Sequence, residues 1–185
     1  MDLEAREIEL EQAYVDTVYE NLEAASKSAK SLVAEGIAMG QIGHEGGLVE
    51  RDAMIFQATR RMTALDAAYD GLVFGRLDLR DGDPRYIGRI GVRTPDRDIL
   101  LIDWRAPAAA LFYQATAQDP AGVIRRRVLR NHLDKIIGVE DDLLDAEAAD
   151  ESLVIIGEGA LMASLSRARD ARMHSVVATI QKEQD

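Results

Sequence analysis

The chain has 185 residues, no cysteine and a formal net charge of −11, and 47% of its residues are hydrophobic. This length and apolar content predict one or two small folded domains, and the lack of cysteine excludes disulfides and thiolate metal sites. So large an excess of acid argues against nonspecific binding of duplex DNA by the whole surface, because phosphates repel it. No stretch approaches the roughly 20 apolar residues of a membrane span, and the segment Met1–Glu4 does not resemble a signal peptide, so a cytoplasmic location is expected.

The first predicted unit, residues 1–70, is an antiparallel pair of helices. Apolar residues recur at seven-residue spacing in both halves, which is typical of a coiled-coil seam. The seam residues are Ile8, Val15, Leu22 and Ala29 with Val18, Ala25, Leu32 and Met39, and then Leu48, Ile55, Met62 and Tyr69 with Ala58 and Leu65. The Gly-rich segment 40–47 permits a sharp reversal, since glycine adopts positive φ without strain. We therefore expect a monomeric chain with a coiled-coil arm about 33 Å long.

The charges of this arm are unevenly spread. Between Asp2 and Glu23, one base (Arg6) accompanies eight carboxylates: Asp2, Glu4, Glu7, Glu9, Glu11, Asp16, Glu20 and Glu23. The candidates for partner contact lie at the tip and just beyond it, and they are His44, Glu45, Leu48, Glu50 and Asp52. A single carboxylate at the apex is a weak ligand for magnesium, because hard cations prefer several oxygens. The arm is therefore interpreted as a docking wedge and not as a metal carrier.

The second predicted unit, residues 71–150, has strand periodicity. Strands are predicted at 72–77, 85–92 and 99–103, with further strands at 109–114, 123–129 and 135–139. Asp81–Pro84 and Thr94–Asp98 have the composition of turns. Short strands with short turns indicate a small antiparallel sheet or barrel, so the whole chain is predicted to be α+β. An acidic link over residues 140–151 leads to the last unit.

Arginines are concentrated at one place in this second unit, at Arg125, Arg126, Arg127 and Arg130. They are candidates for contact with an acidic protein surface or with nucleic-acid phosphates. Adjacent residues of a strand point to opposite faces, so no single face can hold the first three. Solvated strand edges are the interpretation that this pattern favours.

The segment Asp103–Arg105 has two interpretations. Asp103 and Arg105 share a face if they lie on a strand, and an ion pair beside a buried Trp104 would then be part of the architecture. Direct contact with a partner is the alternative. Neither interpretation gives these residues a catalytic role.

The third predicted unit, residues 151–185, returns to helices, at 159–168 and 173–182. The chain ends within this helical pattern, which predicts a fragment of a longer protein. Its last segment, 177–185, resembles the region of superfamily 1 helicases in which a glutamine precedes the phosphate-binding loop. An amide offers both a donor and an acceptor to adenine, so Gln184, with Gln181 as second choice, is the candidate nucleotide-binding residue. No G-x-x-x-x-G-K-[ST] motif occurs, so we expect neither a bound cofactor nor enzymatic activity in this part.

Five segments, in order along the chain, resemble the N-terminal region of actinobacterial HelD proteins. They are Tyr86–Gly91, Ile102–Thr116, Gly122–Arg127, Gly157–Leu161 and Val177–Asp185. The resemblance implies a coiled coil that enters the secondary channel of RNA polymerase, between its β and β′ subunits, and a small globular domain that leads into a helicase-like domain. It also implies that the parent is an ATPase of the UvrD/Rep class, which uses ATP and Mg²⁺ to release stalled or inactive polymerase from nucleic acid. Some relatives also displace rifamycins.

Two other functions remain open. The chain can be the first segment of a DNA helicase that acts on DNA without polymerase, although the acidic first helix argues against DNA on that side. It can also be a structural coiled coil that self-associates, although the tip glycines favour a hairpin within one chain. If the arm docks in a basic channel, a negative arm should bind less well as the salt concentration rises.

Overall fold

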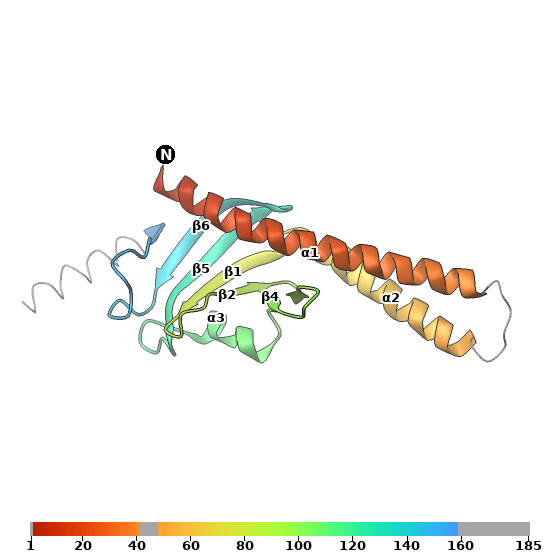
Figure 1. The fold of residues 1–185 in the computed structure, drawn as a ribbon. Helices are drawn as coiled ribbons and strands as arrows, with labels where there is room; N and C mark the ends of the chain where they lie inside the picture. Colours follow the sequence, from red (N-terminus) through yellow and green to blue (C-terminus); the bar gives the residue numbers. More distant parts are fainter. Residues whose placement is uncertain (1, 41–47, 159–185) are drawn as a thin grey trace, which may run out of the picture.

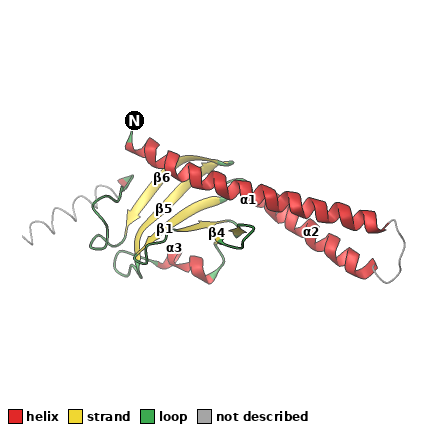
Figure 2. Ribbon diagram, viewed as in Figure 1, coloured by secondary structure: helices red, strands yellow, loops and turns green. Residues whose placement is uncertain are grey.

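The computed structural model describes residues 2–40 and 48–158, which form two long helices followed by a six-stranded sheet (Figures 1 and 2). The helices are α1 (Leu3–Gly40), α2 (Leu48–Ala68) and α3 (Ala110–Gln114), which the 3-10 turn η2 (Pro107–Ala109) precedes. The strands are β1 (Val73–Leu79), β2 (Arg85–Gly88), β3 (Val92–Arg93), β4 (Ile99–Asp103), β5 (Val123–His132) and β6 (Lys135–Leu143). The predicted α+β class is confirmed. The helices expected after residue 158, with Gln181 and Gln184, lie outside the described residues, as do His44 and Glu45 of the tip.

The helices α1 and α2 form an arm that projects past one end of the sheet (Figure 1). They approach closely at Gly36, where an added Cβ would lie 2.7 Å from Cγ1 of Ile55. Ala29, Ala58 and Leu65 are buried along the seam, as the seven-residue spacing predicts. The 21 residues of α2 give a paired length of about 32 Å at 1.5 Å per residue. The predicted helix pair is therefore confirmed, and its length is close to the expected one.

The first half of α1 packs on the sheet and not on α2. Val15 and Val18 are fully buried there, in one apolar core with Val73, Leu129 and Val139 of the strands. The reason lies in the lengths of the helices: α2 has 21 residues against 38 in α1, so it cannot cover the whole seam. The seven-residue spacing did not indicate that the early seam residues pack on the sheet. The boundary proposed at residue 70 stays a prediction, but a shared core links the helices to the sheet.

The sheet has the strand order β3-β4-β2-β1-β5-β6. Neighbouring strands are antiparallel, except that β2 and β4 pair in parallel. The strands predicted at 72–77, 99–103, 123–129 and 135–139 are confirmed as β1, β4, β5 and β6. The single strand predicted over 85–92 is instead divided into β2 and β3. At the end of β2, Gly88 lies so close to the backbone of Leu72 that a Cβ would clash with it.

Two further predictions for this unit, one of a strand and one of a link, were wrong in detail. Residues 109–114 form the end of η2 and the whole of α3, because Pro107 at the first helical position starts a helical turn. The five apolar residues 109–113 are too short a run for periodicity to distinguish a strand from a helix. Phe112 of α3 packs across Gly75 of β1, on the face of the sheet opposite α1. The expected acidic link begins inside β6, which extends to Leu143.

Within the described residues, no helix is both long and apolar enough to cross a membrane.

Candidate docking surface and the anchored base of the arm

A buried network of charges fixes the first half of α1 to the sheet. At its centre is Arg127 of β5, whose side chain is 0% exposed. Its guanidinium binds both carboxylate oxygens of Asp141 on β6, at 2.7 and 2.8 Å. It also binds Glu7 and Glu11 of α1, at 2.7 and 2.8 Å. Two strands and the helix are thus joined through a single guanidinium, whose planar fork suits bidentate pairing.

The network continues along β1 and β2. The second oxygen of Glu11 accepts a hydrogen bond from the Tyr86 hydroxyl at 2.7 Å, and Arg76 donates to Glu11 at 2.8 Å. Arg76 also pairs with Asp78, which in turn pairs with the buried Arg125, both at 2.7 Å. Each buried carboxylate of the network therefore has a cationic partner, which offsets the cost of taking it out of water.

These contacts correct the interpretation of the arginine run. Arg125 and Arg127 were expected at solvated strand edges, but both are buried and pair with carboxylates inside the protein. Arg126 faces the other side of the sheet, as strand alternation predicts, and bonds Asp142 and two carbonyl oxygens near α3. Arg130 is exposed and lies over Gly138. Two features of the sequence could have indicated this network. Arg125 and Arg127 lie two residues apart and therefore share one face of a strand, and Asp141 is an acid that was assigned to a link but lies on β6.

The electrostatics of the network keep its arginine charged. Burial alone would lower the pKa of Arg127, but hydrogen bonds and attraction from Asp141, together with Glu7 and Glu11, outweigh it and raise the pKa. Burial and the neighbouring Glu11 raise the pKa of Tyr86, so its hydroxyl stays protonated and donates to that carboxylate.

Tyrosines and a glutamine of α1 make further contacts with backbone groups of the sheet. The Tyr14 hydroxyl donates to the carbonyl of Leu100 at 2.7 Å, and its ring stacks on that of Tyr86 at 3.8 Å. The amide of Gln12 donates to the carbonyl of Asp134 and accepts from the N–H of Ile136, so α1 is tied to the sheet from β4 to β6.

An alkaline titration should weaken the fold between about pH 10 and pH 12. Burial raises the pKa of Tyr19 to about 12, from an ordinary value of 10.0. A raised folded-state pKa means that the protonated form is favoured by folding, so this stability is intact below pH 10 and is lost as the pH rises through 12. The melting temperature, followed by circular dichroism from pH 9 to pH 12.5, should fall across that window. A Tyr19→Phe variant should start lower and fall less steeply, and a parallel fall in both proteins would contradict this account.

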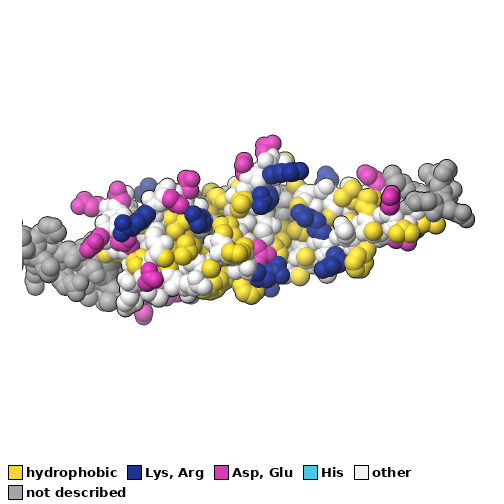
Figure 3. Space-filling view, turned by 90° about the horizontal axis from the view of Figure 1, so that it is seen from below, with side chains coloured by type: hydrophobic (Ala, Val, Ile, Leu, Met, Phe, Trp, Pro, Cys, Tyr) yellow, Lys and Arg dark blue, Asp and Glu magenta, His cyan; other side chains and the backbone are white. Residues whose placement is uncertain are grey.

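The free half of the arm carries an outward face that the sequence analysis overlooked. Along α2, Val49, Ala53, Phe56 and Arg60 follow one another at spacings of four, three and four residues, and all are exposed. Val49 is 81% exposed and Phe56 63% exposed, and the Arg60 guanidinium lies 5.9 Å from the centre of the Phe56 ring. Figure 3 shows hydrophobic side chains beside Lys and Arg on the surface of the arm. The seven-residue step from Val49 to Phe56, outside the seam positions, was the available signal.

The predicted contact residues near the tip are only partly described. Leu48, Glu50 and Asp52 lie in the first turns of α2, and all three are exposed. Asp52 forms a surface ion pair with Arg51 at 2.8 Å. These residues remain candidates for partner contact, and they adjoin the outward face of Val49 and Phe56.

The charge on the projecting part of the arm differs from the expectation. The acidic segment at the N-terminus lies over the sheet, where Glu7 and Glu11 pair with Arg127 and Asp16 lies beside Lys135. Over residues 24–40 and 48–64, five bases (Lys27, Lys30, Arg51, Arg60, Arg61) accompany three acids (Glu35, Glu50, Asp52). The prediction that a negative arm projects from the protein was therefore wrong, because its acids belong to the base.

Asp103 and Arg105 form the expected ion pair, at 2.7 Å, and it lies at the surface. Hydrogen bonds from the Arg105 side chain and backbone lower the pKa of Asp103. Trp104 between them is 49% exposed, so the prediction that it is buried was wrong. The strand ends at Asp103, and strand alternation no longer directs Trp104 into the core.

A family model described as "DNA helicase IV HelD, N-terminal domain" matches residues 8–153. This range takes in nearly all of α1, the whole of α2 and the entire sheet. No curated protein matches the chain. With the match spanning most of its length, the chain belongs to the family of HelD N-terminal domains.

Proposed function

We propose that this chain is the RNA polymerase-binding module of a HelD-type transcription recycling factor. In this proposal the arm docks in the secondary channel of the polymerase, against the β and β′ subunits. The parent ATPase, with ATP and Mg²⁺, then releases stalled or inactive polymerase from nucleic acid. Displacement of rifamycins by the parent is a further possibility that the family resemblance implies.

The observation that supports docking is a projecting arm, anchored at its base, whose outer face exposes Val49 and Phe56. The buried network around Arg127 fixes the direction of α1, and α2 is packed along the free half. The exposed side chains of Val49 and Phe56 do not contribute to the core of this chain, and exposed apolar residues of this kind are typical of protein contact sites. An aromatic ring beside an arginine, as at Phe56 and Arg60, has the composition of an interface hot spot.

Capture by RNA polymerase core enzyme tests the proposal. The unchanged chain should be retained by immobilised core enzyme, and Phe56→Asp should weaken binding by about tenfold or more, because it places a charge at an apolar contact. Ile137→Asp is the matched control, since Ile137 is also 63% exposed but lies on β6 of the sheet and not on α2 (Figure 1).

Failure of the unchanged chain to bind would have two explanations, which a second measurement separates. If the longer parent binds polymerase and the chain alone does not, docking requires the motor part. If neither binds, the polymerase hypothesis is wrong. Retention that Phe56→Asp and Ile137→Asp reduce equally would show that the arm is not the docking element.

A second candidate function is supported by the family's description, which names a DNA helicase. Under this alternative the chain is part of a helicase that acts on DNA without polymerase. Binding to a duplex with a single-stranded tail, measured by fluorescence anisotropy beside the polymerase assay, distinguishes the two functions. Light scattering on the same sample tests the third hypothesis, self-association through the exposed face of α2.

A further inference from the structure

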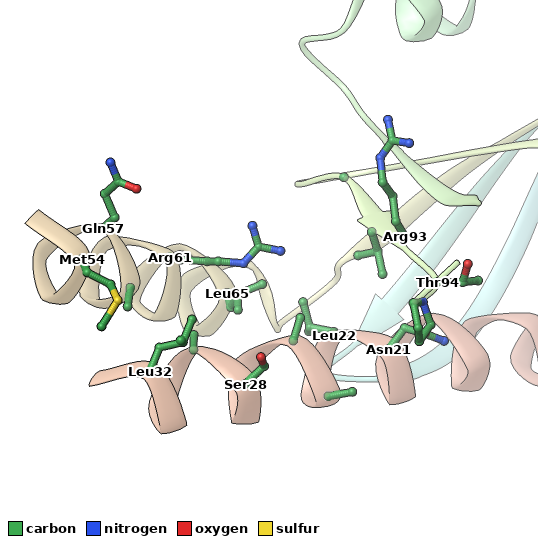
Figure 4. Close-up of a pocket in the computed structure, with 17 residues that line it drawn as sticks. Asn21, Leu22, Ser28, Leu32, Met54, Gln57, Arg61, Leu65, Arg93 and Thr94 are labelled. Carbon is green, nitrogen blue, oxygen red and sulfur yellow. The ribbon is translucent and has the colours of Figure 1, made fainter. Parts of the chain in front are cut away.

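A groove of about 870 Å³ lies where the arm meets the sheet (Figure 4). Its walls come from α1, α2 and the segment 91–95, which contains β3 and the turn after it. Small and apolar side chains form most of the lining, among them Leu22, Ala25, Ala29, Ala58, Leu65 and Val92. Ala29, Ala58 and Leu65 are buried beneath the groove, whereas Ala24 and Leu32, which also line it, are exposed, so the space can accept a polypeptide with an apolar face.

The charges at this groove are all of one sign. Arg61 of α2 and Arg93 of β3 line it, and no acidic residue does, although the whole chain carries a net charge of −11. Figure 4 shows Arg61 extending from α2 into the space before β3, with Arg93 on the far side. Among the described residues, neither guanidinium forms an ion pair, and Arg93 donates only to the carbonyl of Arg97, at 3.0 Å. Both arginines therefore retain donors that suit a carboxylate.

The lining argues for a protein ligand over a nucleic acid. It contains no aromatic side chain on which a base could stack, and two cations are few for a phosphate backbone. A polar sugar-phosphate chain would make no apolar contacts with this lining. A segment with apolar residues on one side and carboxylates at its edge matches both the floor and the charge.

We propose that this groove receives an acidic segment of RNA polymerase that presents apolar residues to the floor and carboxylates to Arg61 and Arg93. The inference rests on the proposed function, since it takes the segment from the same partner. It adds a second contact at the base of the arm, distinct from the outward face of Val49 and Phe56. Two separated contacts would fix the angle at which the arm enters, which a single contact at its outer face would leave free.

Charge reversal at the groove tests the inference with the 185-residue chain. Arg61→Glu and Arg93→Glu should each weaken binding to core enzyme by about tenfold, because like charges would then face each other. Arg6→Glu is the matched control: it makes the same change at an exposed position of a helix, outside the groove, and should alter binding less than about twofold. If the unchanged chain does not bind but the longer parent does, the same variants are compared in the parent. If neither binds polymerase, the proposed function fails and this inference fails with it. If the chain binds and the groove variants bind equally well, only the groove assignment is overturned.

Photocrosslinking identifies the chemistry of the occupant. A photoreactive residue in place of Gln57, which lines the groove, should link to a polymerase peptide that contains both acidic and apolar residues. Linkage to a basic peptide would overturn the proposal. Binding of a single-stranded oligonucleotide that Arg61→Glu abolishes would also overturn it, in favour of a phosphate ligand.

Discussion

Replacing Arg127 with methionine should lower the free energy of unfolding by about 3–5 kcal/mol, because the buried carboxylates of Glu11 and Asp141 lose a cation that binds both of them. Glu11 and Asp141 have fully buried side chains, and each binds the Arg127 guanidinium directly. Methionine preserves much of the volume, so the loss would come from the unpaired charges and not from a cavity. Urea unfolding followed by circular dichroism measures this change, through the midpoint at an unchanged slope.

Arg105→Met is the control for this prediction. Its ion pair with Asp103 is at the surface, where water solvates both partners, so its loss should hardly move the midpoint. Equal losses in the two variants would show that the network around Arg127 is not held away from water. A triple variant that also replaces Glu11 and Asp141 with apolar residues should recover part of the stability, because the two fully buried carboxylates are then removed together with their cation.

The network explains why the arginine run was misinterpreted from the sequence. Strand alternation correctly separates Arg126 from Arg125 and Arg127, but it does not say which face is buried. That depends on α1 crossing the sheet, and the contacts from Glu7 and Glu11 to Arg127 span more than a hundred residues. Net charge along a window of sequence cannot show that opposite charges from distant segments pair. The acidic first helix was therefore assigned to contact with a partner and the basic strand to solvated edges, whereas the two bind each other.

The helices show a similar division between what is local and what is not. Seven-residue spacing is a local property, and it predicted both helices and the buried seam residues Ala29, Ala58 and Leu65 correctly, whereas Leu32 and Leu48 are exposed. The spacing does not show which surface packs against the seam. The same pattern runs through the half of α1 that packs on the sheet and through the half that packs on α2. The short apolar run that became α3 is ambiguous by periodicity, and its helical turn is set by Pro107 and by the fit of Phe112 over Gly75.

Because the two halves of α1 pack against different surfaces, an apolar-to-aspartate substitution should lower the free energy of unfolding by different amounts at two seam positions. Val18→Asp should cost about 4 kcal/mol or more, enough to unfold most of the domain, because Val18 is fully buried between α1 and the sheet. Ile55→Asp should cost only about 1–2 kcal/mol, because Ile55 is half-buried and an aspartate there can reach water. Its effect should be confined to the free arm, where Ile55 packs against Gly36.

Hydrogen exchange followed by mass spectrometry separates these outcomes, because it reports each segment independently. In Ile55→Asp, peptides from α2 and from the end of α1 should exchange faster while those from β1 and β5 keep their protection. In Val18→Asp, protection should be lost in the sheet as well. If Val18→Asp leaves the sheet protected, then α1 is an appendage and the arm is not anchored through the core. A docking arm needs that anchor. If the helix pair pivoted freely at its base, the conformational entropy lost on binding would offset much of the free energy gained from its contacts.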